Sequence, residues 1–118
     1  MEHFQVERKD SQNISILYIM GYLDAHTAPK LEKEIQDLID EQNYNIIVNF
    51  TELSYISSAG LGVFMGFIEK VRENGGDIKL ASMNPKIYRV FDLLGFPTLY
   101  DILETEDEAK EKFALNMN

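Results

Sequence analysis

Residues 46–80, with the sequence IIVNFTELSYISSAGLGVFMGFIEKVRENGGDIKL, contain the pattern from which the fold class is predicted. It begins with Ile46-Ile47-Val48, a short apolar run that is typical of a buried strand. Gly75-Gly76 is a stop signal for the helix between, and Ile78 and Leu80 mark another strand. A strand, a helix and a second strand in this order predict a parallel pair joined by a crossover helix. The apolar residues that predict this helix recur at helical spacing: Leu61, Phe64, Met65, Ile68 and Val71.

The residues before this stretch predict a hairpin and then a helix. Alternation at Phe4 and Val6, a polar turn at residues 9–13 and the apolar run Ile14–Met20 indicate two antiparallel strands. Thr27 can cap the helix that follows. That helix is predicted from a second apolar stripe with charged residues between its members: Leu31, Ile35, Leu38 and Ile39.

The residues after the stretch continue the alternation of helices and strands. Asn84-Pro85 predicts a helix start and Gly95 its end. A short strand is expected at Thr98–Ile102, and Thr105 and Glu108 have capping-box spacing before a last helix. The order β-β-α-β-α-β-α-β-α predicts an α/β fold over one domain, residues 1–118. We expect a four- or five-stranded mixed sheet with helices packed mainly on one side.

Composition excludes several classes of function. The 118 residues include 20 acidic and 11 basic side chains, a formal charge of −9. This balance argues against nucleic acid or an anionic membrane as the partner, since both require a basic surface. There is no cysteine and there are only two histidines, so no metal site or cofactor is expected. No segment has the length of a membrane span, and the polar start is not a signal peptide, so we expect a cytoplasmic protein.

The segment Thr51–Gly62 is the strongest candidate for a functional site. It lies between a strand expected to end near Phe50 and a helix expected to begin near Ala59, at the carboxyl end of a strand where ligands collect. Ser57 and Ser58 lie where free helix N–H groups favour an anion, and the glycines at 60 and 62 allow close approach. A serine before a helix can equally be a plain N-cap, and the residues alone leave both interpretations open.

Known catalytic motifs do not fit this segment. Met65 stands where a dinucleotide-binding turn would need its third glycine, and no lysine follows the glycines as a phosphate-binding P-loop requires. Ile56 stands where the nucleophile elbow of a serine hydrolase would need glycine, and neither histidine is an evident base. We therefore expect no enzymatic activity.

The same segment resembles a known family. Ile56–Gly62, with the sequence Ile-Ser-Ser-Ala-Gly-Leu-Gly, is similar to the signature of bacterial anti-sigma factor antagonists, the single-domain members of the STAS group. Gly21–Asp24 resembles the family's motif at the end of the second strand, and Ile47–Leu53 resembles its third strand. The resemblance extends from about Phe4 to Ala114 and implies the strand and helix order given above.

The resemblance implies a phosphorylation switch. Dephosphorylated family members bind an anti-sigma factor that is also a GHKL-type serine kinase, and this binding frees the sigma factor. The kinase then phosphorylates a serine, which maps onto Ser58, and a metal-dependent serine phosphatase reverses the modification. Ser57 is the second choice, because this chain has Ser57 and Ala59 where the family commonly has Asp and Ser or Thr. If Ser58 is the N-cap, its phosphate would meet the N–H groups of Gly60 and Leu61.

The resemblance also implies a partner surface around the acceptor serine. The backbone of Ala59, Gly60, Leu61 and Gly62 is the expected phosphate loop. Asp24, Ser57 and Ser58 are the expected partner-binding residues, within a face made by Tyr22–Thr27, Thr51–Ser58 and the start of the second helix. For Asp24 an Asx turn is the equally plausible structural explanation.

Two other functions remain compatible with the sequence. A STAS-type module could sense a nucleotide or scaffold partners with Ser58 unmodified. A small hydrolase could use Ser57 or Ser58 as its nucleophile, although it would need a base that the sequence does not reveal.

Overall fold

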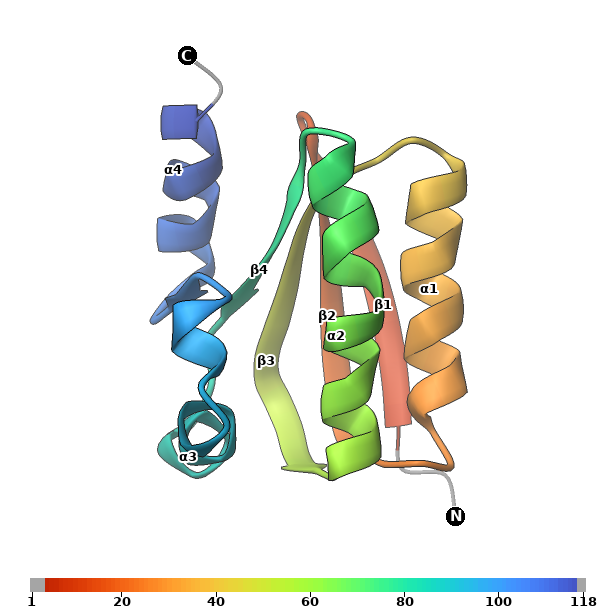
Figure 1. The fold of residues 1–118 in the computed structure, drawn as a ribbon, viewed down its shortest axis with the longest axis vertical. Helices are drawn as coiled ribbons and strands as arrows, with labels where there is room; N and C mark the ends of the chain where they lie inside the picture. Colours follow the sequence, from red (N-terminus) through yellow and green to blue (C-terminus); the bar gives the residue numbers. More distant parts are fainter. Residues whose placement is uncertain (1–3, 117–118) are drawn as a thin grey trace.

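The computed structural model describes residues 4–116 and contains one five-stranded sheet with four α-helices (Figure 1). The strands lie side by side in chain order, and the predicted order of strands and helices is confirmed. The strands are β1 Phe4–Ser11, β2 Ile14–Leu23, β3 Asn45–Ile56, β4 Asp77–Ala81 and β5 Ile102–Leu103. The helices are α1 Ala28–Asp40, α2 Ser58–Glu73, α3 Pro85–Leu93 and α4 Glu106–Asn116.

The sheet is mixed, as expected. β1 and β2 form the antiparallel hairpin, whereas β2–β3, β3–β4 and β4–β5 are parallel. The molecule is 42 Å long, and we call the two ends of this long axis its poles. The parallel strands begin at one pole and end at the other (Figure 1). The two poles therefore carry different sets of connections.

β3 is longer than the sequence indicated. It was expected to end near Phe50, but it continues to Ile56 and stays paired with β2 through two irregularities in the register. At the first of these, the Asn49 side chain accepts a hydrogen bond from the backbone N–H of Thr51 at 2.9 Å. Bulges of this kind add residues to one strand without breaking the sheet. The segment before Ser57 is thus mostly strand instead of loop.

Helices cover the two faces of the sheet unequally. The main core lies under α1, α2 and α3, while a smaller cluster lies on the other face under α4 and includes Ile16, Ile47, Ala109 and Phe113. The expectation of helices mainly on one side is therefore confirmed. Among the helices of residues 4–116, none has the length and apolar character of a membrane span.

A buried lysine ties α4 to the sheet. The side chain of Lys79 is 1% exposed, and its Nζ lies 2.9 Å from Asp77 Oδ2 and 2.8 Å from Asp101 Oδ2. The same Nζ lies 4.7 Å from the ring centre of Phe113 on α4. Burial opposes the charge, but the two carboxylates outweigh it and raise the pKa of Lys79, while the hydrogen bond from Lys79 lowers the pKa of Asp101. Charge and cation–π contacts together stabilise this edge of the fold.

Two predicted helix starts are confirmed, whereas one predicted cap and the bounds of one predicted strand are corrected. Asn84 Oδ1 accepts the Ile87 N–H at 2.8 Å, and Thr105 exchanges capping-box hydrogen bonds with Glu108. Thr27 precedes α1 but makes no side-chain cap, because its hydroxyl is used within the preceding loop. The expected strand Thr98–Ile102 is wrong, since residues 96–98 form a 3₁₀ turn and only Ile102–Leu103 pairs with β4.

Candidate functional site

The candidate site lies where β2 and β3 end side by side. Leu23 and Ile56 are the last paired residues of these strands, and the Leu23 carbonyl accepts the N–H of Ser57 at 2.9 Å. The chain then turns directly into α2 at Ser58. The end of β2, the loop that follows it and the first turn of α2 are therefore neighbours at one pole of the molecule (Figure 1).

The N-cap of α2 is Ser57 and not Ser58. Ser57 has extended backbone geometry, and its Oγ accepts the N–H of Gly60 at 3.4 Å. Ser58 is the first helical residue, and its side chain is exposed. Within residues 4–116 the Ser58 hydroxyl has no hydrogen-bond partner. The sequence left two roles open for these serines, and each serine has one of them. Ser57 is the N-cap of the helix, and Ser58 presents a free hydroxyl.

This register changes which backbone N–H groups are open to an anion. The N–H of Gly60 bonds to the Ser57 hydroxyl, and the N–H of Leu61 bonds to the Ser57 carbonyl at 3.0 Å. The expectation that a Ser58 phosphate would meet the N–H groups of Gly60 and Leu61 depended on Ser58 being the N-cap, and this condition is not met. The first N–H groups of a helix, here those of Ser58 and Ala59, have no partner inside the helix. The positive end of the helix dipole lies at the same place.

Gly60 is required by close packing. A Cβ atom at Gly60 would lie 2.8 Å from the Leu23 carbonyl oxygen and 3.0 Å from Ile56 Cγ1. The glycine therefore allows α2 to start directly against the ends of β2 and β3. Gly62 is exposed, and a Cβ atom there would meet nothing within 4 Å. The structure thus gives the first glycine a packing role and leaves the second on the open surface.

The loop after β2 is held in place by Asp24. Its Oδ1 accepts the N–H of His26 at 2.9 Å and that of Thr27 at 3.1 Å, which is an Asx turn. The Thr27 hydroxyl accepts the Asp24 N–H at 2.9 Å and donates to the Tyr22 carbonyl at 2.8 Å. Asp24 therefore shapes the loop beside Ser57, whatever else it binds, and His26 is exposed.

Three large side chains around the site are exposed: Tyr22 and Tyr55 belong to the predicted partner face, whereas Met65 was misplaced. Tyr22 and Tyr55 pair across β2 and β3 with ring centres 5.8 Å apart, and they are 49% and 48% exposed. Met65 was expected in the core, but it is 53% exposed on α2. The sequence placed Tyr22 and Tyr55 beside the two motifs, which indicates that both lie near the site. It could not show that the two rings pair, because their pairing depends on a bulged register.

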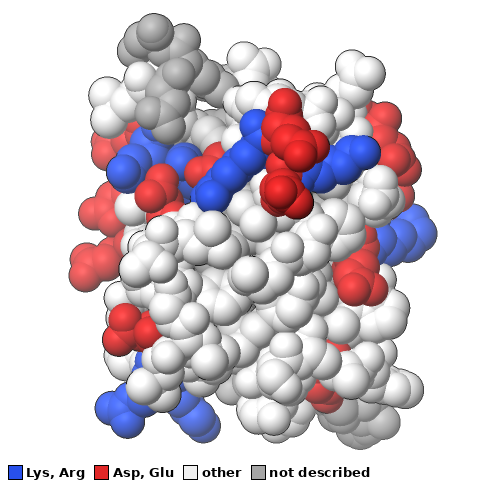
Figure 2. Space-filling model, viewed as in Figure 1, with Lys and Arg blue, Asp and Glu red and all other residues white. Residues whose placement is uncertain are grey.

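The exposed side of α2 next to the site carries no charge. No charged residue occurs between Ser58 and Ile68, and Ala59, Gly62, Met65 and Gly66 are exposed there. Figure 2 shows this face as a broad uncharged area, with charged side chains gathered beyond it toward the other pole and at the margins. On a chain with a formal charge of −9, such a neutral surface is suited to contact another protein.

The described residues do not supply the groups of a hydrolase or a metal centre. Within residues 4–116 neither Ser57 nor Ser58 forms a hydrogen bond to a histidine, as an activated serine nucleophile would. In the same part of the chain, no three His, Asp or Glu side chains are grouped so as to hold a metal ion. In the described part of the chain, the Ser58 hydroxyl is therefore not hydrogen-bonded to a histidine base.

Comparison with known families and sequences gives a consistent result. The family described as STAS domain matches residues 5–109. The anti-sigma-B factor antagonist of Bacillus subtilis is 32% identical over 100 residues, covering 85% of this chain and 91% of the relative. The protein of the same description from Listeria monocytogenes is 28% identical over 104 residues, covering 88% and 90%.

Solved structures agree with the sequences. The unphosphorylated anti-sigma factor antagonist SpoIIAA is similar with a TM-score of 0.78 and 26% identity, covering 94% of this chain and 96% of that one. The phosphorylated form of SpoIIAA from Bacillus has a TM-score of 0.71 at 26% identity, covering 93% and 98%. This fold is therefore known in both a phosphorylated and an unphosphorylated protein.

Proposed function

Because the chain belongs to the STAS domain family, whose curated relatives here are anti-sigma factor antagonists, we propose that it acts as one through a phosphorylation switch at Ser58. In the dephosphorylated state it binds an anti-sigma factor that is also a GHKL-type serine kinase, and the sigma factor is released. Phosphorylation of Ser58 by this kinase ends the binding, and a serine phosphatase restores it. The chain itself is not an enzyme, and its place of action is the cytoplasm.

The observation that carries the proposal is the free hydroxyl of Ser58 on the first turn of α2. The side chain is exposed, whereas the Ser57 hydroxyl is engaged as the N-cap. A kinase must reach the acceptor oxygen, and Ser58 offers it without breaking a hydrogen bond of the fold. The existence of SpoIIAA in a phosphorylated form supports a phosphorylated state in this family.

The fold can accept the phosphate without rearrangement. A phosphoserine adds about −1.5 to −2 charges at neutral pH. The first turn of α2 contains no acidic residue, and an anion at a helix N-terminus is favoured by roughly 0.3–1 kcal/mol. The phosphate therefore leaves the free protein stable and acts at the interface, where it adds bulk and must be desolvated. A penalty of about 3 kcal/mol weakens binding by about a hundredfold.

The partner surface follows from the same geometry. It consists of the loop held by Asp24, the Tyr22–Tyr55 pair and the neutral side of α2. Charge reversal in Asp24→Lys weakens kinase binding more than Glu111→Lys, which lies on α4. Because Asp24 also holds the loop, Asp24→Asn serves as control, since its Oδ1 can still accept both N–H groups. Equal losses from Asp24→Lys and Glu111→Lys would contradict this location of the interface.

Phosphopeptide mapping tests the proposal. The protein is isolated from its native cells, and the peptide that contains Ser57 and Ser58 is sequenced by tandem mass spectrometry. We expect phosphate on Ser58, lost in Ser58→Ala and retained in Ser57→Ala. Phosphate on Ser57 alone would move the acceptor, and a peptide without phosphate in every growth condition would favour an unmodified scaffolding or nucleotide-sensing module.

A further inference from the structure

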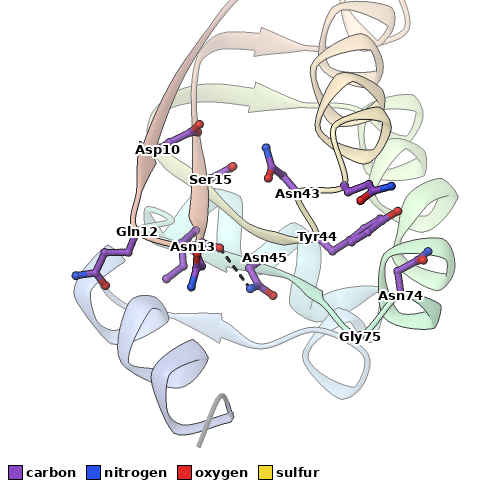
Figure 3. Close-up of a pocket in the computed structure, with 11 residues that line it drawn as sticks. Asp10, Gln12, Asn13, Ser15, Asn43, Tyr44, Asn45, Asn74 and Gly75 are labelled. Atoms are coloured by element: carbon purple, nitrogen blue, oxygen red, sulfur yellow. Dashed lines mark hydrogen bonds between the residues drawn. The ribbon is translucent and has the colours of Figure 1, made fainter.

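A polar hollow of about 280 Å³ lies at the pole opposite Ser58, where the parallel strands begin (Figure 3). Three connections form it: the β1–β2 turn, the loop from α1 to β3 and the turn from α2 to β4. Nothing in the proposed switch uses these residues. We call it the carboxamide hollow, after the six Asn and Gln residues among those that line it: Gln12, Asn13, Gln42, Asn43, Asn45 and Asn74.

The carboxamide hollow concentrates one chemistry. Its six Asn and Gln residues are half of the twelve in the chain. Asn43, Asn45 and Asn74 each donate one hydrogen bond through Nδ2, to Glu41, to the Asn13 carbonyl and to the Lys70 carbonyl. Within residues 4–116 the side chains of Gln12, Asn13 and Gln42 form no hydrogen bond. Each free carboxamide can donate and accept at once.

Two of these residues have a backbone conformation that is unfavourable for any residue except glycine. Gln12 has φ 58° and Gln42 has φ 65°, and together they are two of the three non-glycine residues with positive φ in the described part of the chain. For an L-residue this conformation costs roughly 1–2 kcal/mol, and glycine would adopt it freely. Glutamine at both positions keeps a carboxamide at the rim where glycine would be the more stable choice. Strain of this kind is typical of functional sites.

The charges around the hollow disfavour an anionic ligand. No lysine or arginine lines it, and the chain as a whole is at −9. Its single carboxylate, Asp10, is occupied by two hydrogen bonds of 3.0 Å from Arg8, which lower the pKa of Asp10. Apolar lining is limited to Ile14 and part of Tyr44, so a hydrophobic ligand is also disfavoured.

We propose that the carboxamide hollow binds an uncharged saccharide unit. Sugar hydroxyls donate and accept in the way that free carboxamides do, and the half-buried ring of Tyr44 offers an apolar face for the sugar ring. The volume lies just below the range of about 300–1,000 Å³ for small-molecule sites, which suits one sugar ring better than a larger ligand. The site would add an input at the pole opposite the phosphorylation switch, and it does not depend on that switch.

Amide spectra of the full chain test the proposal, because the carboxamide NH₂ groups give their own signals. The protein is titrated with D-glucose, N-acetyl-D-glucosamine and the anionic D-gluconate. We expect saturable shifts of the Gln12 and Gln42 side-chain signals with at least one neutral sugar, with a Kd on the order of 1 mM, and weaker binding of gluconate.

The variant Gln12→Gly/Gln42→Gly separates binding from folding. It removes both carboxamides and relieves both strained residues, so its thermal stability equals or exceeds that of the wild type. We expect the affinity of this double variant for the sugar to fall by about tenfold or more. Gln36→Ala on α1 should bind the sugar like the wild type. Absence of shifts with both neutral sugars, unchanged binding by the double variant, or preference for gluconate would each overturn the proposal.

Discussion

The close packing at Gly60 predicts different effects for two alanine substitutions on the same helix. In Gly60→Ala the new Cβ would lie 2.8 Å from the Leu23 carbonyl oxygen, 2.9 Å from Leu23 Cγ and 3.0 Å from Ile56 Cγ1. The oxygen cannot retreat easily, because it is backbone and accepts the N–H of Ser57. Such overpacking costs roughly 1–3 kcal/mol. In Gly62→Ala the Cβ meets nothing within 4 Å.

Both substitutions gain about 1 kcal/mol of helix propensity, so the difference between them isolates the packing cost. We expect Gly62→Ala to be more stable than the wild type and Gly60→Ala to be less stable than Gly62→Ala by about 1–3 kcal/mol. Because the chain has no tryptophan, urea unfolding is followed by far-ultraviolet circular dichroism. Equal unfolding free energies for the two variants would refute the argument that Gly60 sets the position of α2.

Two further predictions concern capping and charge. Ser57→Ala removes the N-cap and lowers the unfolding free energy by about 1 kcal/mol, whereas Ser58→Ala leaves it nearly unchanged; the reverse order in urea unfolding would return the cap to Ser58. The pKa of Asp101 is lower in the folded protein than in the unfolded chain, where it is about 3.9. Its ion pair with Lys79 therefore stabilises the fold at pH values above about 3.9, and this contribution is lost as the pH falls further. Asp101→Asn is therefore less stable than the wild type at neutral pH, and the gap narrows toward pH 3; a gap independent of pH would contradict the ion pair.

Local signals in the sequence predicted most of the fold. Asn84 before Pro85 and the Thr105–Glu108 spacing mark helix starts through contacts within a few residues, and both are observed. The order of strands and helices was predicted from the spacing of apolar residues, which is also a local signal. The resemblance to the STAS family, carried by residues 56–62, is confirmed by the family match over residues 5–109.

The features that the sequence missed depend on contacts between distant segments. β3 extends to Ile56 because bulges keep it paired with β2, and this register cannot be read from either strand alone. Met65 has the spacing of a core residue, but the buried side of α2 is turned toward Gly60 and Val63, since the missing side chain at Gly60 lets the helix approach the strands there. The N-cap lies one residue earlier than expected, and this too depends on a contact between distant segments. The Leu23 carbonyl accepts the Ser57 N–H and so fixes where α2 begins.

We propose that one phosphate on Ser58 blocks a partner without changing the fold. The most direct measurement compares the free and Ser58-phosphorylated proteins in two ways, by backbone amide spectra and by titration with the purified anti-sigma factor. We expect shifts confined to residues 22–27 and 56–65, together with binding about a hundredfold weaker for the phosphorylated form. Shifts spread across the sheet, or equal affinity of the two forms, would contradict it.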